Sequence, residues 1–173
     1  MAELILRPYE TISAGAWNVI DSVIPEVLSD ESDAHVVYNT NGNQEMLLSL
    51  SDIEELEELY SSATITIHAR CGGKGPETVR VKLETEGGDV LISEDIALSE
   101  TTLASFTTVL TEIPELELED INGLQFRLTG TTDRQVYIAE AFVTLSTDEV
   151  VLSGSPIKLT SGLIQLTSGK ISL

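Results

Sequence analysis

The sequence is poor in cysteine, in basic residues and in long apolar stretches, and each shortage excludes a class of protein. A single cysteine, Cys71, in 173 residues cannot build an internal disulfide framework. Nine lysines and arginines against 29 aspartates and glutamates give a formal net charge of -20, which repels nucleic acids. No apolar run approaches the ~20 residues that a membrane-spanning helix needs. We therefore expect neither a nucleic acid nor a membrane as a partner.

Sequence motifs for catalysis and metal binding are also missing. The two histidines, His35 and His68, lie in no His-x-x-x-His or Cys-His cluster, so we expect no zinc site. The glycines form neither a Gly-x-Ser-x-Gly elbow nor a Walker or dinucleotide-binding pattern. Residues 30–33 lack the spacing of an EF-hand, so we expect a solvated acidic loop, with a loop-bound calcium ion as the alternative. The sequence predicts a protein that is not an enzyme and has no cofactor.

Aromatic residues make up only 5% of the chain, with one tryptophan, Trp17. Small and apolar residues surround Trp17, which favours a packing anchor over a sugar-stacking platform. Cys71 alternates with Ile65 and Ile67, which indicates a buried and inert thiol. His68 falls on the opposite, polar side of the same segment, where a surface position is expected.

Alternation of apolar and polar side chains predicts that most of the chain forms antiparallel strands. The alternating segments are 64–71, 79–84, 124–129 and 136–145. A phase shift near Ala139-Glu140 predicts a β-bulge, and Gly87-Gly88-Asp89 predicts a tight hairpin turn. Strands separated by turns, without long helices, predict an all-β fold. We expect an antiparallel β-sandwich of jelly-roll type over residues 1–147.

One short surface helix is expected in this sandwich, over residues 51–59. Ser51 and Glu54 have the spacing of a capping box, and apolar residues follow at three-residue intervals. Pro25 interrupts the segment 19–28, so that segment is expected to be a loop with at most one turn.

Glutamates alternate with leucines in the segment 115–120, which predicts an edge strand with its charged face in water. A docking strip for a basic partner is the functional alternative. The acidic composition as a whole has the same two interpretations, since it suits either solubility in a salty medium or docking onto a basic surface.

The end of the chain carries a regular repeat. Residues 150–173 repeat an apolar-x-apolar triplet every seven residues, and Thr-Ser-Gly follows the second and third copies. An i, i+2 spacing places both apolar side chains on one face of a strand, so residues 148–173 are expected to form a tail of short strands. Such strands need a cover, either from the chain's own body or from identical tails. The expected contact residues are Ile157, Leu159, Ile164, Leu166, Ile171 and Leu173.

A particular order of elements runs through residues 4–146. The elements are a first strand ending in Arg7-Pro8, a segment from Trp17 to Asp21, an acidic loop entering a strand at 29–38, the strand 63–70, a Gly-rich hairpin, and the segments 121–128 and 141–145. In this order they resemble a family of small jelly-roll proteins of tailed-phage virions. Such modules occur as capsid decoration (cement) proteins and as parts of tail or fibre assemblies. Residues 54–59 and the Thr-Ser-Gly tail depart from the family's pattern.

The resemblance implies a structural virion protein at the outer capsid surface. The leading hypothesis is a decoration protein that binds the major capsid protein and stabilises the capsid through homotrimeric contacts. The alternative is a tail- or fibre-associated adhesin module that binds host surface glycans, although aromatic residues are scarce. A hydrolase or lyase built on a jelly roll is the third hypothesis.

Overall fold

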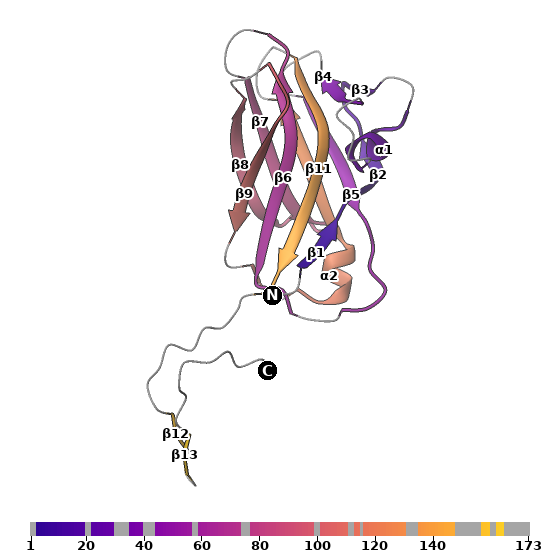
Figure 1. Cartoon of the computed structure of the whole chain (residues 1–173). Coiled ribbons are helices and arrows are strands. Elements are labelled where there is room, and N and C mark those ends of the chain that lie inside the picture. The colour runs from indigo at the N-terminus through magenta and orange to yellow at the C-terminus, as the bar shows by residue number, and fades with distance from the viewer. Residues whose placement is uncertain are drawn as a thin grey trace.

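The computed structural model describes most of the chain between Glu3 and Thr147 and two short strands beyond it. The described residues are 3–19, 22–29, 35–39, 44–56, 59–73, 77–98, 101–110, 113–114, 116–130 and 135–147, and the backbone of 157–159 and 162–164. The body is a sandwich of two antiparallel sheets packed face to face, which we name sheet A and sheet B (Figure 1). The all-β antiparallel sandwich predicted from the sequence is confirmed.

Sheet A has the strand order β3-β4-β11-β6-β9, and β1 also pairs with β11. Its strands are β1 (Glu3–Leu6), β3 (Trp17–Val19), β4 (Val37–Asn39), β6 (Ser62–Cys71), β9 (Ala104–Leu110) and β11 (Val136–Ser146). The bulge predicted in β11 is present as a register shift between Ile138 and Glu140.

Sheet B has the strand order β2-β5-β10-β7-β8. Its strands are β2 (Pro8–Ser13), β5 (Gln44–Leu50), β7 (Glu77–Thr85), β8 (Val90–Leu98) and β10 (Leu124–Gly130). The predicted turn between β7 and β8 is confirmed, and Gly88 adopts a φ of 89°, which favours glycine. The glycine-rich segment after Cys71 leads from β6 in sheet A to β7 in sheet B, so it connects the two sheets.

The inner faces of the two sheets form the hydrophobic core. Every second residue is buried along β6 and, in β7, from Glu77 to Leu83, as the two-residue period of a strand requires. The large side chains that are fully buried include Leu6, Leu48, Ile65, Ile67, Leu83 and Phe126. Each such side chain contributes roughly 1.5–3 kcal/mol to folding, so this core is the main source of stability.

Trp17 and Cys71 belong to this core, as the sequence predicted. Trp17 is 4% exposed, and its indole N–H donates to the carbonyl oxygen of Gln44 at 3.1 Å. That bond connects β3 of sheet A to the first residue of β5 in sheet B. The Cys71 side chain is fully buried, so the thiol lies out of solvent.

The helix predicted over residues 51–59 is wrong for the residues that the structure describes there. The Ser51 N–H donates to the Arg7 carbonyl at 2.8 Å, and the Ser51 hydroxyl accepts from the Arg7 N–H at 3.2 Å. The Asn122 side-chain amide binds both the N–H and the carbonyl of Ile53, at 2.9 and 3.1 Å. These long-range bonds engage the groups that a capped helix would use, so tertiary contacts override the local signal.

Two short helices form at other positions. α1 (Ile24–Ser29) replaces the loop expected there, and Pro25 is tolerated because first-turn N–H groups have no partner within a helix. The helix buries Val27 and Leu28 and packs against β2 of sheet B and β11 of sheet A (Figure 1).

α2 (Leu118–Asn122) forms where an edge strand was expected, so that prediction is also wrong. The Asp120 carboxylate accepts from the Glu117 N–H at 2.9 Å, which completes a capping box at the start of the helix. The turn buries Leu116 and Ile121 together, whereas a strand with this sequence would place them on opposite faces.

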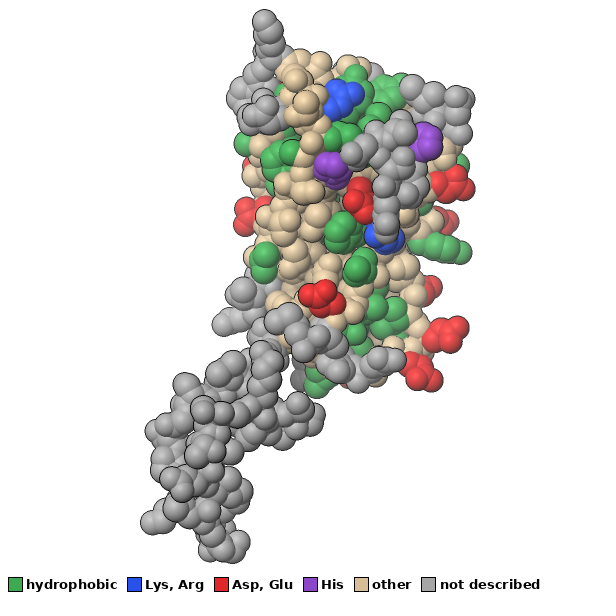
Figure 2. All heavy atoms as spheres, in the orientation of Figure 1, with side chains coloured by type: hydrophobic (Ala, Val, Ile, Leu, Met, Phe, Trp, Pro, Cys, Tyr) green, Lys and Arg blue, Asp and Glu red, His purple; other side chains and the backbone are tan. Residues whose placement is uncertain are grey.

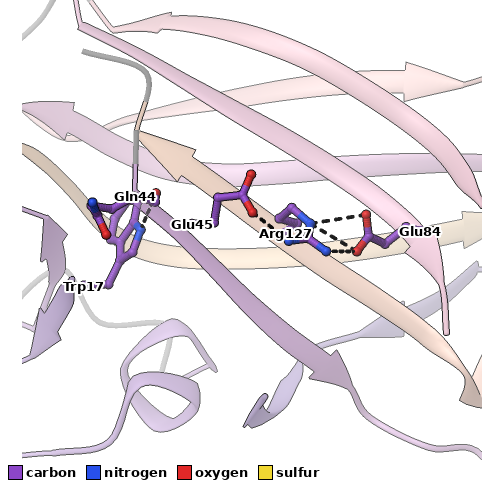
Figure 3. A network of polar contacts seen from close by, with 5 residues as sticks. All are labelled: Trp17, Gln44, Glu45, Glu84 and Arg127. Carbon is purple, nitrogen blue, oxygen red and sulfur yellow. Dashed lines mark hydrogen bonds and ion pairs between the residues drawn. The ribbon is translucent and has the colours of Figure 1, made fainter. Parts of the chain in front are cut away.

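A charged network crosses the outer face of sheet B (Figure 3). Arg127 on β10 donates through Nε and Nη2 to Glu84 on β7, and through Nη1 to Glu45 on β5 at 2.8 Å. The hydrogen bonds to Glu84 raise the pKa of Arg127, so the guanidinium stays protonated. The Glu84 side chain is only 7% exposed, and Arg127 therefore neutralises a carboxylate that is almost out of water.

A second ion pair on this face, Arg80 with Asp95, is far more exposed. Its oxygen–nitrogen distances are 2.7 and 2.9 Å, and the side chains are 43% and 49% exposed. The hydrogen bonds from Arg80 lower the pKa of Asp95. The pair therefore stabilises the fold at neutral pH and loses this effect as the pH falls through the lowered pKa, and solvent keeps the contribution small.

One buried polar side chain, Asn39 on β4, connects the two sheets. Its Oδ1 accepts from the N–H of Val136, at the start of β11, at 3.0 Å. Its amide nitrogen lies against Gly130, at the end of β10 in the other sheet. A Cβ at Gly130 would lie 2.0 Å from Asn39 Nδ2, so this position requires glycine.

Candidate functional site

The outer face of sheet A presents an ordered grid of side chains. Strand register places them in rows that cross the sheet: Asn18, Tyr38, Tyr137 and Arg70; then Glu140, His68 and Ser105; then Phe142, Thr66 and Thr107; then Ile5, Thr144, Thr64 and Val109; then Glu3, Ser146 and Ser62. Figure 2 shows this side of the molecule, where most of the acidic side chains lie near the margins.

The first row holds two tyrosines and an arginine in direct contact. Tyr137 on β11 lies opposite Tyr38 on β4 and opposite Arg70 on β6. The two tyrosine rings are 5.9 Å apart between centroids and tilted by 32°, and the Arg70 guanidinium carbon lies 4.0 Å from the Tyr137 centroid. Such spacings are favourable for aromatic and cation–π contacts, which hold the three half-buried side chains in place.

Gly72 and Gln135 contact Tyr137 and fix the position of its side chain. The Tyr137 hydroxyl donates to Gln135 Oε1 at 2.8 Å, and the Gly72 N–H donates to the Gln135 carbonyl at 2.8 Å. A Cβ at Gly72 would lie 2.9 Å from the Tyr137 ring and 2.7 Å from Gln135 Cβ. The orientation of Tyr137 therefore depends on the absence of a side chain at position 72.

A second aromatic residue with an arginine follows along β11. Arg7 lies with its guanidinium carbon 5.2 Å from the Phe142 centroid, and its Nη1 binds Glu140 Oε1 at 2.9 Å. His68, on the polar side of β6 as the sequence predicted, lies opposite Glu140 and is half-buried. Hydroxyl groups of threonine and serine fill most of the remaining positions of the grid.

This arrangement combines ring faces with donors and acceptors on one exposed face of the sheet. A ligand with both apolar C–H faces and many hydroxyl groups could satisfy the two kinds of contact at once. The sequence predicted His68 on the polar side of its strand, and nothing in it indicated that the two tyrosines form a pair. The alternation of residues along its strand could have predicted that Tyr137 faces outward. Its contact with Tyr38 could not be predicted, because it depends on which strands are neighbours in the sheet.

The predicted tail contacts are only partly described. β12 (Ile157–Leu159) and β13 (Gly162–Ile164) form a separate antiparallel sheet, with Ile157 opposite Ile164 and Leu159 opposite Gly162. The second strand begins at Gly162, two residues before Ile164. Leu166, Ile171 and Leu173 lie outside the described residues, as does the acidic segment 30–33. The contact role of all six residues stays a prediction.

Deleting residues 157–173 should leave the sandwich folded and weaken self-association. The expectation follows because an isolated two-stranded hairpin is at most marginally stable and needs a cover. Size-exclusion light scattering of the full chain and of the truncated chain measures the change in mass. Equal association of both proteins would contradict a joining role for the tail.

An open depression beside α2 is lined by Asp52, Glu86, Leu118, Glu119, Asn122 and Gly123. Within the described residues, no three His, Cys, Asp or Glu side chains are grouped so that they could hold a metal ion. None of the described helices is long and apolar enough to cross a membrane.

The fold is similar to those of several proteins of known structure. No family model and no curated protein matches the chain. Its structure is similar to the C-terminal CBM6 domain of LamC, a marine laminarinase from Zobellia galactanivorans, with a TM-score of 0.51 and 11% identity over 84% of this chain and all of that domain (100%). It is also similar to the Agl-KA catalytic domain, with a TM-score of 0.50 and 6% identity over 90% of this chain and 29% of that one.

A CBM36-1 domain of a multidomain xylanase, from the hindgut metagenome of Trinervitermes trinervoides, matches with a TM-score of 0.49 and 12% identity over 86% of this chain and 100% of that domain. At such low identities the similarity concerns the fold alone. The chain is thus a β-sandwich of the jelly-roll type, similar in fold to a carbohydrate-binding module, which confirms the predicted fold class.

Proposed function

We propose that this chain is a non-catalytic module that binds glycans on the outer face of sheet A. The observation that carries the proposal is the row of Tyr38, Tyr137 and Arg70, which places two contacting rings and a cation beside hydroxyl-bearing side chains. Sugars present C–H faces that pack on aromatic rings and hydroxyls that bond to polar groups. Tyrosine suits such a surface because it has a large ring, a polar tip and little rotational freedom.

The carboxylates of this face support a binding role rather than a catalytic one. Its described acidic residues are Glu140, which is held by Arg7, and Glu3, which is opposite Ser146. Positions 140 and 146 of β11 are separated by roughly 20 Å at ~3.3 Å per residue. Glycosidases hold their two carboxyl groups roughly 5–9.5 Å apart, so this pair cannot act together on one bond.

Of the two virion roles predicted from the sequence, the glycan-binding alternative is favoured over capsid decoration. The sandwich is similar to a CBM6 domain, which is a carbohydrate-binding module by its name. This similarity supports the proposal only by showing that such a scaffold can carry a glycan-binding face. A virion location, a homotrimer and a major capsid protein as partner stay predictions, and a glycan-binding module would serve an adhesin in a tail or fibre.

Replacing Tyr137 with alanine should weaken glycan binding by about tenfold or more, which corresponds to about 1.4 kcal/mol. A glycan array identifies the ligands, and isothermal titration calorimetry then compares wild type, Tyr137→Ala and Tyr38→Ala. Tyr9→Ala is the matched control, because Tyr9 is 73% exposed on β2 of the other sheet. Its affinity should equal that of the wild type.

Thermal unfolding of each variant separates a binding defect from a folding defect. Both tyrosines of the row are only half-buried on the outer face, so the melting temperature should change little. The proposal is wrong if the array finds no glycan ligand, or if a folded Tyr137→Ala protein binds as tightly as Tyr9→Ala.

A further inference from the structure

The cation of the tyrosine row differs from the other described arginines. Arg7 is paired with Glu140, Arg80 with Asp95, and Arg127 with Glu45 and Glu84. Arg70 has the Tyr137 ring as its contact and, within the described part of the chain, no carboxylate partner. A positive charge without a counter-charge is notable in a chain of net charge -20, because carboxylates are plentiful.

The geometry around Arg70 fits a planar anion. A guanidinium stacked on an aromatic ring keeps its N–H groups in a fixed fork, and such a fork matches the two oxygens of a carboxylate. Since Arg70 lies over Tyr137 at 4.0 Å, a sugar on the tyrosine pair would lie next to these donors.

The described acidic residues of this face leave the row open to an approaching anion. On the described outer face, Glu140 forms an ion pair with Arg7, and Glu3 lies opposite Ser146 in the strand register, at the far end of β11. Ser146 is nine residues from Tyr137, which corresponds to roughly 30 Å at ~3.3 Å per residue. The screening length at physiological salt is ~8 Å, so the Glu3 carboxylate contributes little repulsion at Arg70.

We propose that the glycan recognised by this face is acidic, and that Arg70 binds the carboxylate of a uronic acid whose ring packs on Tyr137 and Tyr38. The inference rests on the proposed function and deepens it, because it assigns a ligand class to the same site. His68 lies in the next row on the same side of β6.

The test compares charged and neutral sugars of identical linkage. Oligogalacturonates and oligoglucuronates are titrated into the full chain, each against its carboxyl-reduced neutral counterpart, by isothermal titration calorimetry at physiological salt. We expect the wild type to bind a uronate oligosaccharide about tenfold or more tightly than the neutral form. Arg70→Gln should abolish this preference, and Arg70→Lys should retain only part of it, because lysine keeps the charge without the fork.

Arg80→Gln is the matched control, since it removes an arginine of the other sheet and should leave the preference unchanged. If neutral oligosaccharides bind as tightly as uronates and Arg70→Gln changes neither affinity, the acidic ligand class is wrong while glycan binding stands. If binding requires sulfated sugars and ignores uronates, the carboxylate assignment is likewise overturned. Binding to no glycan at all would overturn the proposed function together with this inference.

Discussion

Replacing Arg127 with methionine should lower the free energy of unfolding by about 3 kcal/mol. Arg127 is the cation that neutralises Glu84, whose side chain is 7% exposed, and it also binds Glu45. Methionine retains the apolar length of the arginine side chain and leaves the Glu84 charge nearly buried without its partner. Urea denaturation followed by circular dichroism measures the loss.

Arg80→Met is the control for this prediction, because it removes an equal charge from the same outer face of sheet B. Its ion pair with Asp95 is about half exposed, so the loss of stability should be a small fraction of that of Arg127→Met. Adding Glu84→Gln to Arg127→Met should restore part of the stability, since an amide is cheaper to bury than a carboxylate. Equal losses for the two arginine variants, or a further loss in the double variant, would contradict the assignment.

Asn39→Ala and Gly130→Ala should each destabilise the protein by about 2 kcal/mol, and by the same mechanism. Asn39→Ala leaves the Val136 N–H buried without its acceptor. Gly130→Ala brings a Cβ to within 2.0 Å of the present position of Asn39 Nδ2, so the amide must turn away and the same bond is lost.

A double-mutant cycle tests this shared mechanism. The double variant Asn39→Ala/Gly130→Ala removes the obstructing amide as well as adding the methyl group. Its loss in the free energy of unfolding should therefore equal that of one single variant rather than the sum of both. Asn18→Ala serves as the control because Asn18 is exposed on β3, and it should change the free energy of unfolding by less than about 0.5 kcal/mol. Additive losses would show that Asn39 and Gly130 act independently.

The strands could be predicted from the sequence because their signal is local. In β6 and β7 the apolar residues alternate without interruption, and burying one face of a strand requires just this period. The bulge in β11 and the turn at Gly88 were predictable for the same reason, since a phase shift and a pair of glycines are visible in the chain itself.

The helices were not predictable, because their signals competed with contacts from distant residues. Ser51 carries a good capping pattern, but its backbone binds Arg7, and Asn122 binds the backbone of Ile53. The segment 115–120, which leads into α2, alternates like a strand, yet burying Leu116 together with Ile121 requires a turn of helix. A local sequence pattern can be compatible with both a helix and a strand or loop. It does not indicate which of these a distant side chain will stabilise.

The sequence by itself determined that the chain is an acidic all-β sandwich, because charge and two-residue periodicity are properties of adjacent residues. It also marked Trp17 and Cys71 as core residues. Only the tertiary structure decided that Tyr38, Tyr137 and Arg70 form one row, since these residues come from β4, β11 and β6. Strand order is set by how the two sheets bury their faces against each other, so neighbours across strands depend on the packing of the whole sandwich.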